Sequence, residues 1–366
     1  MPPKQMRFDT SDSDADFYTV EEADFPTTRY QGSKRRILDW VWQKMDIVEF
    51  DSLLDAFGGT GTVAFRAKQH GKRVVYNDYM TYNHYIGKAI IENDNVTLDE
   101  DDIGFLLERH NEYEYPTFIQ DTFEGIYFTD DENAWLDTVR RNVREFDCEY
   151  KTALAFAVIG QCCLAKRPYN LFHRANLDMR LNDVDRSFGN KATWDKPFGE
   201  HFSEKVAEFN DAVFNNGYEN GAYGRNALEW TDPPETDLVY IDPPYFDRTT
   251  NNNSIDYRFY YHFLEGFIKY EKWNEMIDHT SKTKKVQSGS TPWMDEAKVY
   301  DAFDRLFDIY SDRIIVVSYN SAGLPTPQEL KTRLSKTKEN VEMFAKDYQY
   351  VLSPEEKQEV LIVAYD

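Results

Sequence analysis

Short apolar runs alternate along the chain with stretches in which apolar residues recur at about every third or fourth position, the helical period. Runs of strand length lie at residues 52–54, 73–76, 238–241 and 313–318. Such runs are typical of strands that a parallel sheet buries on both faces. Residues 359–363 predict one more strand, antiparallel and near a sheet edge. Helical periodicity is found at residues 63–70, 133–144 and 150–164.

The order of these elements predicts an α/β fold. Between residues 29 and 95 a strand, a helix and a second strand follow one another, and this order implies a right-handed parallel unit. Residues 96–225 break that rhythm with helical periodicity and an irregular, basic and aromatic stretch. Strand-like runs then return. We therefore expect a Rossmann-like sheet built from residues 25–95 and 226–366, with an inserted, mainly helical domain at residues 96–225.

The first 24 residues are polar and acidic, and they predict a disordered tail without the apolar segment of a signal peptide. No apolar run approaches the roughly 18 residues of a membrane span. The three cysteines are Cys148, Cys162 and Cys163. Their odd number and the adjacent pair argue against a disulfide framework and favour a reducing cytoplasm. No Cys/His spacing matches a zinc site, so we expect no metal.

The charge balance is unusual for a protein that binds nucleic acid. The formal net charge is −23, whereas a DNA-binding protein is expected to present a basic surface. Either the chain binds no polyanion, or it works in a salt-rich cytoplasm, where an acidic surface maintains solubility. Basic residues are concentrated at residues 29–44 and 166–196. These clusters favour a contact surface, although a solvated face of mixed charge has the same composition.

Asp242, Pro243, Pro244 and Tyr245 follow the apolar run of residues 238–241. Open α/β sheets bind ligands at the carboxyl ends of their strands. There the carboxylate of Asp242 can accept a hydrogen bond from an exocyclic amine, and the ring of Tyr245 can stack on a planar base. Prolines supply carbonyl oxygens without N–H groups. The alternative is a plain strand-ending turn, because Pro-Pro is a common breaker.

Residues 55–62, Asp-Ala-Phe-Gly-Gly-Thr-Gly-Thr, link the first strand to the next helix. Glycines in such a loop let the backbone turn tightly and approach a ligand. Asp78 ends the next strand, about 20 residues on, where an acid usually holds ribose hydroxyls. As an ordinary cap it would need no ligand. Gly59, Gly61 and Ala64 also fit the dinucleotide pattern, so a nicotinamide cofactor competes here, whereas the absence of Lys-Ser/Thr excludes a P-loop.

The motifs in this order resemble those of a known family. Residues 29–34 (Arg-Tyr-Gln-Gly-Ser-Lys), residues 55–61, Asp78 and residues 242–245 are similar to the ordered motifs of Dam-like, α-group adenine-specific DNA methyltransferases. The resemblance covers roughly residues 29–366. It implies S-adenosylmethionine as methyl donor, the amino group of adenine in double-stranded DNA as acceptor, target recognition by the insert, and a cognate restriction endonuclease as a compatible partner.

The resemblance also implies roles for individual residues. Tyr30 and Lys34 would contact the methionine end of the cofactor, with Lys34 able to pair with its carboxylate. Asp242 would be the catalytic acid, which also lies against the cofactor, and Asp78 would bind the ribose. The glycine loop would contribute Asp55, Phe57, Gly59 and Gly61.

The chain departs from the family pattern in small ways. Tyr30 stands where Trp is frequent, Gln31 replaces a small residue, and Gly58 is an additional glycine. None of these changes removes a needed functional group. Asn226 is a candidate for contact with the cofactor's adenine, and a surface turn is equally open for it.

The expected chemistry requires no base with a shifted pKa. Adenine's amine is a poor nucleophile because its lone pair is delocalised into the ring. Hydrogen bonds to Asp242 and the Pro243 carbonyl would draw the nitrogen towards tetrahedral geometry and free the lone pair to attack the methyl group. Positioning would then supply much of the acceleration. The target base must leave the duplex stack, and Tyr245 would stack on it.

Polar and basic side chains cluster in the insert after residue 166. Arg and Asn are the residue types that pair bidentately with guanine and adenine edges. We expect DNA contacts from Arg167, Asn170, His173, Arg174, Arg180 and Arg186. The alternative is that His173 and the neighbouring aromatic residues belong to a local core. Residues 257–262 are likewise either a buried aromatic helix face or a cover over the flipped base.

Three other functions are compatible with parts of the pattern. One keeps the chemistry and changes the acceptor to RNA or a protein amide. Another is an NAD-dependent oxidoreductase, but a hydride-transfer site has no evident use for residues 242–245. The third is a binding module with an inactive methylase fold, against which the intact Asp78, Asp242 and Tyr245 speak.

Overall fold

The computed structural model describes residues 23–182, 191–247, 257–287, 289, 291–348 and 357–366. The expected acidic tail lies outside these residues, except for positions 23 and 24. Arg186, one of the residues expected to contact DNA, also lies outside them. The carbonyl oxygen of Ala23 accepts a hydrogen bond of 2.7 Å from Nε2 of Gln69, so this end of the expected tail is held against the folded chain.

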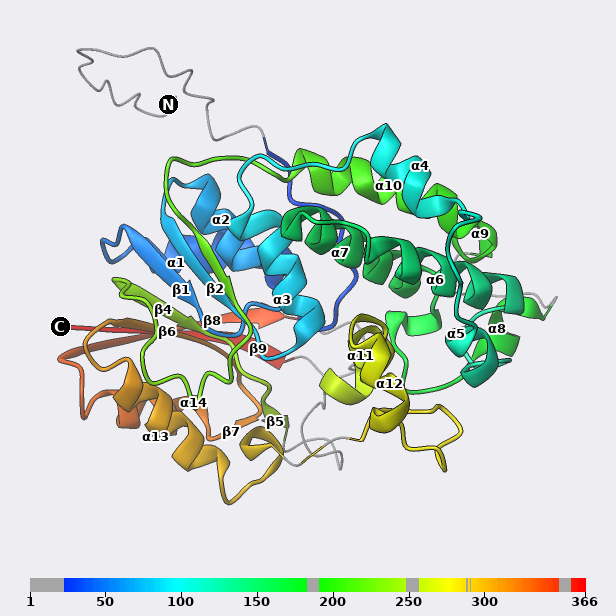
Figure 1. Cartoon of the computed structure of the whole chain (residues 1–366). Helices are drawn as coiled ribbons and strands as arrows, with labels where there is room; N and C mark the ends of the chain where they lie inside the picture. The colour runs from blue at the N-terminus through cyan, green and yellow to red at the C-terminus, as the bar shows by residue number, and fades with distance from the viewer. Residues whose placement is uncertain (1–22, 183–190, 248–256, 288, 290, 349–356) are drawn as a thin grey trace, which may run out of the picture.

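Seven of the described strands form one sheet in the order β3-β2-β1-β4-β6-β9-β8 (Figure 1). The first five run parallel, β9 is antiparallel to β6, and β8 is antiparallel to β9. The prediction of an α/β fold with an antiparallel C-terminal strand near an edge is confirmed. The strands are β1 Ser52–Asp55, β2 Arg73–Asn77, β3 Gly221–Tyr223, β4 Leu238–Ile241, β5 Phe246–Asp247, β6 Ile314–Asn320, β7 Gly323–Leu324, β8 Asn340–Tyr348 and β9 Lys357–Tyr365.

The helices match the predicted periodicity where that periodicity is long. The three predicted helices are found as α2, α6 and α7 with small shifts at their ends. The α-helices are α1 Leu38–Met45, α2 Thr62–Gln69, α3 Thr81–Gly87, α4 Glu100–Leu107, α5 Phe118–Thr122, α6 Asp130–Val143, α7 Glu149–Ala165, α8 Leu177–Leu181, α9 Lys191–Asp195, α10 Phe198–Asp211, α11 Tyr257–Ile268, α12 Tyr270–Met276, α13 Val299–Ile309 and α14 Pro327–Leu334. Short helical segments lie at Lys34–Arg36, Lys88–Glu92, Pro168–Asn170 and Pro292–Met294.

The sheet is covered on both faces, because alternate residues of its strands point to opposite sides. Leu53 packs in one core with residues of α1 and α2, and its neighbour Leu54 packs in the other with residues of α13 and α14. Val316 and Val317 of β6 divide in the same way. These two helix layers lie on opposite sides of the sheet in Figure 1. The uninterrupted apolar runs of the sequence are the consequence of this double burial.

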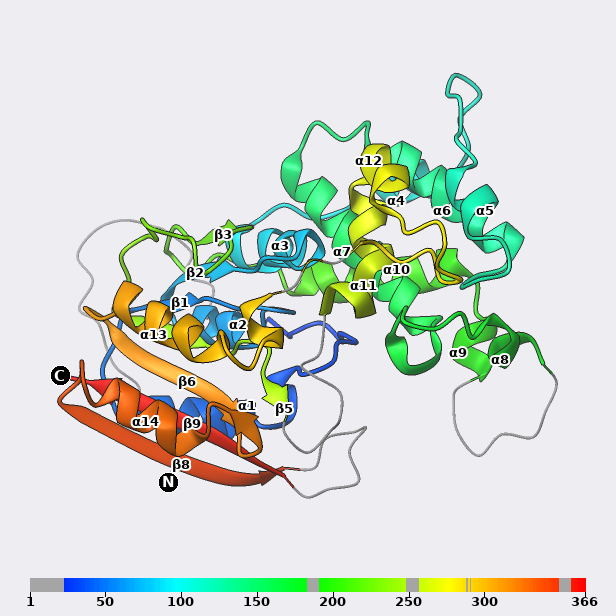
Figure 2. The same ribbon diagram turned by 90° about the horizontal axis from the view of Figure 1, so that it is seen from below.

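Helices α4 to α12 form a module beside the sheet (Figure 2). It contains α4 to α10, as the expected insert does, but it also includes α11 and α12, which follow β4 in the chain. Trp273 of α12 contacts Phe123 with ring centroids 4.8 Å apart. Conversely β3, which the expected boundaries place in the insert, pairs with β2 in the sheet. A three-residue strand is too short to show a periodic pattern, which explains why it was missed.

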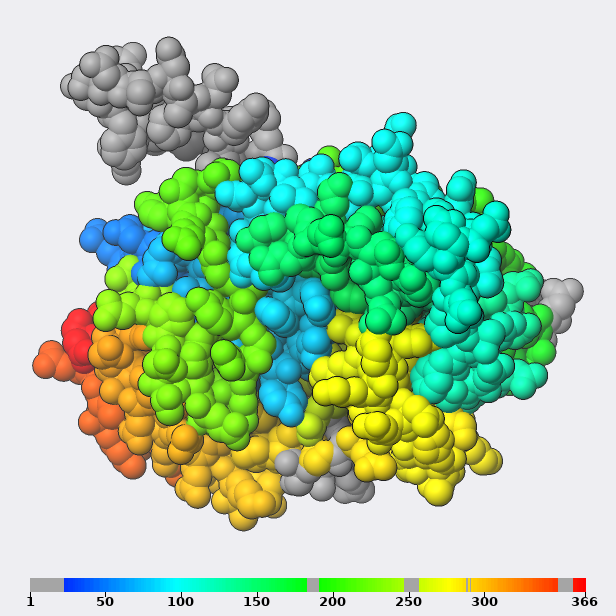
Figure 3. Space-filling model, viewed as in Figure 1, coloured from blue at the N-terminus to red at the C-terminus, as the bar shows by residue number. Residues whose placement is uncertain are grey.

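The helical module meets the sheet where α7 packs on α3. The hydroxyl of Tyr82 on α3 accepts a hydrogen bond of 2.8 Å from Nε2 of Gln161. Gly160 lets the two helices approach, because a Cβ there would lie 2.1 Å from the Tyr82 ring. On the face drawn in Figure 3, α3 fills the junction between the two parts. The helical module is thereby fixed beside the carboxyl ends of the strands.

Candidate active site

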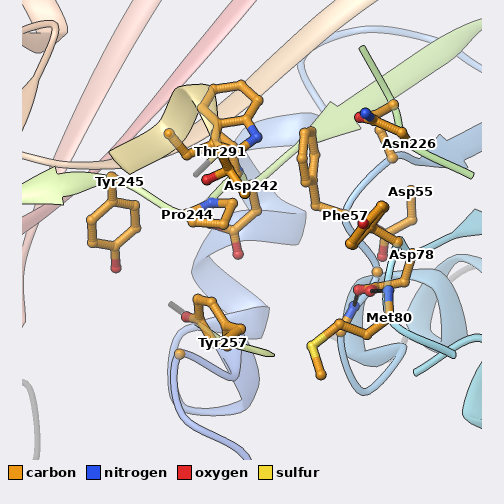
Figure 4. Close-up of a pocket in the computed structure, with 18 of the residues that line it drawn as sticks. Asp55, Phe57, Asp78, Met80, Asn226, Asp242, Pro244, Tyr245, Tyr257 and Thr291 are labelled. Carbon is orange, nitrogen blue, oxygen red and sulfur yellow. Dashed lines mark hydrogen bonds between the residues drawn. The ribbon is translucent and has the colours of Figure 1, made fainter. Parts of the chain in front are cut away.

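A cavity of about 720 Å³ lies at the carboxyl ends of β1, β2 and β4 (Figure 4). The glycine-loop side carries Asp55, Phe57 and Asp78, and the opposite side carries Asp242 and the residues that follow it. All residues named from the sequence for catalysis or cofactor binding line this cavity, except Gly61, which lies just behind it. They are Tyr30, Lys34, Asp55, Phe57, Gly59, Asp78, Asp242, Pro243, Pro244 and Tyr245.

The glycine loop turns directly from β1 into α2. Gly59 and Gly61 have φ values of +55° and +79°, in the left-handed region that favours glycine. Gly58 is needed for a different reason, because a Cβ there would lie 2.0 Å from the ring of Tyr76. The extra glycine of the sequence is therefore a packing requirement of this chain. The hydroxyl of Tyr76 in turn donates to the carbonyl oxygen of Gly59, 2.6 Å away.

Asp78 ends β2 and holds the glycine loop. Its Oδ2 accepts a hydrogen bond of 2.9 Å from the backbone N–H of Gly59, and its Oδ1 accepts one of 2.7 Å from that of Met80. Burial raises the pKa of Asp78 to about 6, against the opposing effect of these hydrogen bonds. Two ionised oxygens have about four acceptor sites, so Asp78, which lines the cavity, can accept a further hydrogen bond.

Asp55 ends β1 and is almost completely buried, at 2% exposed. Its Oδ1 has no hydrogen-bond partner among the described residues. Burial, followed by the nearby charges of Asp242 and Asp78, raises the pKa of Asp55 well above its ordinary value. An unpaired buried carboxylate oxygen is costly. Because Asp55 lines the cavity, a donor or cation bound there would remove this cost.

Asp242 follows β4 and faces a buried lysine. The ammonium nitrogen of Lys34 lies 3.1 Å from Oδ1 of Asp242 and 2.8 Å from Oε1 of Glu359. Lys34 is 6% exposed and Glu359 is fully buried. Burial raises the pKa of Asp242 to about 6; the Lys34 charge opposes that shift and the Glu359 charge adds to it. The family resemblance had predicted that Lys34 could pair with the carboxylate of the cofactor. The sequence gave no indication that Glu359 lies beside Lys34.

Aromatic rings form the cavity wall beside Asp242. The ring of Tyr30 stacks on the rings of Tyr257 and Tyr261, with centroids 5.7 and 4.4 Å away. The ring of Tyr245 meets that of Tyr319 edge to face at 5.6 Å. Tyr257 lines the cavity, so the segment that the sequence left undecided contributes to the site as well as to a helix face.

One further residue of the cavity wall was not predicted from the sequence. Trp293 lines the cavity and packs edge to face on Phe57, with centroids 5.5 Å apart. Trp293 lies in a segment without helical or strand periodicity. The only signal for it in the local sequence is the Pro-Trp pair at residues 292 and 293. Asn226, considered for a contact with the cofactor, also lines the cavity, and its Oδ1 accepts a hydrogen bond of 3.2 Å from the N–H of Leu228.

Two of the arginines expected to contact DNA are inside the helical module. Arg167 is 1% exposed and donates hydrogen bonds to the carbonyl oxygens of Leu171, Tyr127 and Arg174. Arg180 is 4% exposed and pairs with Glu132, 2.7 Å away. This burial corrects the expectation for both, because an enclosed guanidinium cannot reach a DNA backbone.

The other residues of that group lie nearer the surface. Arg174 is exposed, and Asn170 and His173 are partly exposed. Asn170 has a φ of +57°, and its Oδ1 accepts a hydrogen bond of 3.3 Å from Nη1 of Arg29. The same short segment thus supplies one arginine to the interior and one to the surface.

Among the described residues, none of the helices is both long enough and apolar enough to cross a membrane.

The chain is similar to known proteins over most of its length. The chain is 27% identical to the type II methyltransferase M2.HphI of Haemophilus parahaemolyticus, over 92% of this chain and 95% of that protein. It is 25% identical to the type II methyltransferase M.FokI of Planomicrobium okeanokoites, over 84% of this chain and 46% of that protein. It is 24% identical to the type II methyltransferase M.NlaIII of Neisseria lactamica, over 81% of this chain and 84% of that protein.

These likenesses favour DNA methylation over the RNA, protein-amide and nicotinamide alternatives. The family of D12 class N6 adenine-specific DNA methyltransferases matches residues 30–317, a range that includes residues 30–34, the glycine loop, Asp78 and residues 242–245. The chain belongs to this D12 class N6 adenine-specific DNA methyltransferase family.

Proposed function

We propose that the cavity binds S-adenosylmethionine beside an adenine flipped out of double-stranded DNA, and that Asp242 receives the adenine amine. One observation carries this proposal: the glycine loop, Asp78 and the tetrapeptide of residues 242–245 line a single cavity of about 720 Å³. Pockets of roughly 300–1,000 Å³ are typical of cofactor and ligand sites. A cavity shared by both motif sets brings a methyl donor and an amine acceptor within reach of each other.

The residues of the cavity fit a positively charged nucleoside cofactor. Asp55, Asp78 and Asp242 line it together with Lys34, and Glu229, Arg225, Arg258 and Arg305 line it as well. A sulfonium and an α-ammonium group would be attracted to the three aspartates. The unpaired Oδ1 of Asp55 suits the ammonium, and the free lone pairs of Asp78 suit the ribose hydroxyls. When bound, S-adenosylmethionine supplies an electrophilic methyl group.

The protein's contribution to the reaction is to bind and orient the amine. Asp242 and the Pro243 carbonyl each accept a hydrogen bond from the amine, which draws the nitrogen towards tetrahedral geometry and takes its lone pair out of conjugation with the ring. Lys34 neutralises Asp242, so the carboxylate can be buried and still accept a hydrogen bond. Tyr245 and the neighbouring tyrosines offer faces for stacking, worth about 1–3 kcal/mol per base in single-strand sites. Positioning of this kind accounts for a large part of many rate enhancements.

The helical module is proposed as the part that recognises the target. Its surface carries Asn170, His173 and Arg174, of the types that hydrogen-bond to bases and phosphates. The net charge of −23 means that any DNA contact has to come from such local basic patches. The relatives are named type II methyltransferases, which supports a cognate restriction endonuclease as a partner of this chain.

The test combines binding with product analysis. Calorimetry with S-adenosylmethionine, and with NAD as control, is expected to give heat for the first ligand alone. DNA from cells that express the chain is expected to contain N6-methyladenine at one recurring sequence, and DNA from cells that express Asp242→Ala is expected to lack it. Full methylation by Asp242→Ala, or binding of NAD in place of S-adenosylmethionine, would refute the proposal.

A further inference from the structure

Glu359 is a buried acid that stands behind the active site. It lies on β9, next to Asn320 of β6 in the sheet register, and its side chain is 1% exposed. Its Oε1 accepts a hydrogen bond of 2.7 Å from the hydroxyl of Ser318 and lies 2.8 Å from the ammonium of Lys34. Glu359 does not itself line the cavity, whereas both Lys34 and Asp242 do.

The three charged groups are in direct contact, with Lys34 paired to both acids. Lys34 lies between Glu359 at 2.8 Å and Asp242 at 3.1 Å. A buried ammonium must be paired, and charges interact strongly where water is excluded. The ammonium of Lys34 is therefore fixed at two points, and the second of them is set by Ser318 on β6. Without Glu359, only Asp242 of these two acids would remain paired with Lys34. The ammonium of Lys34 could then move together with Asp242 or with a bound ligand.

We propose that Glu359 is a positioning residue of methyl transfer: held by Ser318, it fixes the ammonium of Lys34, and Lys34 fixes the Asp242 carboxylate in the orientation that receives the adenine amine. This inference rests on the proposed role of Asp242. Its consequence is that the C-terminal strand, far from the family motifs in sequence, takes part in the reaction geometry. A displacement of about 1 Å at a reacting group can cost about 100-fold in rate.

Glu359 also acts on Asp242 through its charge, and this effect has a sign that distinguishes it from a structural role. The charge of Glu359 raises the pKa of Asp242, and that of Lys34 lowers it. The other titratable groups near Asp242 are Asp55 on β1, Tyr240 on β4, and Tyr245 and Tyr257. Replacing Glu359 by a neutral residue removes one raising influence, so the pKa of Asp242 must fall.

The experiment compares Glu359→Gln with the wild-type chain. We expect kcat to fall by roughly 10- to 100-fold, while the Kd for S-adenosylmethionine changes by less than about 3-fold. The acid limb of the kcat profile is expected to move to lower pH. Glu359→Asp keeps the charge but shortens the side chain, so it should lower kcat and leave the acid limb in place. Wild-type kcat in Glu359→Gln, or an acid limb that does not move, overturns the inference.

Two further variants separate positioning from stability. Ser318→Ala removes the hydroxyl that holds Glu359 and should lower kcat several-fold without loss of fold; if Glu359→Gln does not fold, unchanged kcat in Ser318→Ala overturns the inference. Glu132→Gln removes a partly buried acid that also has two cationic partners, Lys166 and Arg180, and should leave the acid limb unmoved. Full activity in Asp242→Ala would instead refute the proposed function itself.

Discussion

The carboxylate of Asp78 accepts the backbone N–H of Gly59 at 2.9 Å, so the end of β2 directly holds the glycine loop that follows β1. Its other oxygen accepts the N–H of Met80 at 2.7 Å. Because both oxygens face backbone donors, an amide at this position would have to point its NH₂ group at one of them. Asp78 is therefore a structural support of the loop as well as the acid proposed to bind the ribose.

Asp78→Asn is accordingly expected to weaken S-adenosylmethionine binding by about 10- to 100-fold, because a charged hydrogen bond is worth about 1.5–3 kcal/mol. Calorimetric titration measures the change in Kd. Asp99→Asn is the matched control, since Asp99 also accepts a backbone N–H, from Asp102 at 2.9 Å, but lies at the exposed start of α4. Equal affinity in Asp78→Asn and wild type would contradict the ribose-binding role.

Gly58→Ala is expected to destabilise the fold by about 1–3 kcal/mol, the usual cost of overpacking. The added Cβ would lie 2.0 Å from the Tyr76 ring, and that ring cannot retreat easily because it is fully buried. Gly104→Ala on α4 meets nothing within 4 Å and should stabilise the chain by about 0.5–1 kcal/mol through helix propensity. Urea unfolding of both variants measures the difference, and equal midpoints would show that the loop can move away.

Five strands of the sheet, and the edge at which β1, β2 and β4 end, could be predicted from the sequence, whereas β3, β8 and the contacts across the site could not. Leu238–Ile241 is a continuous apolar run and coincides with β4, because both of its faces are buried. The motifs that end β1, β2 and β4 meet in one cavity because parallel strands end at the same edge. The contact of Glu359 with Lys34 could not be predicted from the sequence, because it depends on β9 running antiparallel beside β6.

The basic stretch after residue 166 shows a second limit of local patterns. Arg167 and Arg174 have the same side chain and lie seven positions apart, yet one is enclosed and one is exposed. Burial of Arg167 depends on Tyr127, which comes from a distant part of the chain and contributes both a carbonyl acceptor and a ring face. Local composition indicates basic character, but it does not tell which basic side chains the fold encloses.

The activity is expected to fall as the pH drops below about 6. Burial raises the pKa of Asp242 from 3.8 to about 6, and a protonated Asp242 would offer a weaker acceptor to the adenine amine. The measurement is kcat at saturating substrates between pH 5 and 8. A flat profile through pH 6 would contradict the role of an ionised Asp242.

Stability should respond to pH in the opposite sense. A carboxyl whose pKa is higher in the folded than in the unfolded state binds more protons when folded, so its contribution to stability is largest below pH 4 and is lost as the pH rises through about 6. Asp78, whose pKa is also raised to about 6, makes the same contribution. Asp78→Asn should therefore gain stability relative to wild type, by roughly 1–3 kcal/mol, between pH 4.5 and 7. Denaturant unfolding of Asp78→Asn and wild type at pH 4.5 and at pH 7 measures the difference in the free energy of unfolding. The same difference at both pH values would contradict the prediction.

The contrast between Arg174 and Arg167 gives the last prediction. Arg174→Ala should weaken DNA binding and lower the salt dependence of the binding constant by about one unit of slope, as the loss of one phosphate contact does, while the melting temperature stays unchanged. Arg167→Ala should instead destabilise the fold by about 3 kcal/mol or more, because it leaves the carbonyl oxygens of Leu171, Tyr127 and Arg174 without their guanidinium partner. Salt titrations of DNA binding and thermal unfolding of both variants measure the two effects. If Arg174→Ala bound DNA with wild-type affinity and salt slope, the surface of this segment would not contact the phosphates, and DNA would have to approach the cavity over another face of the helical module.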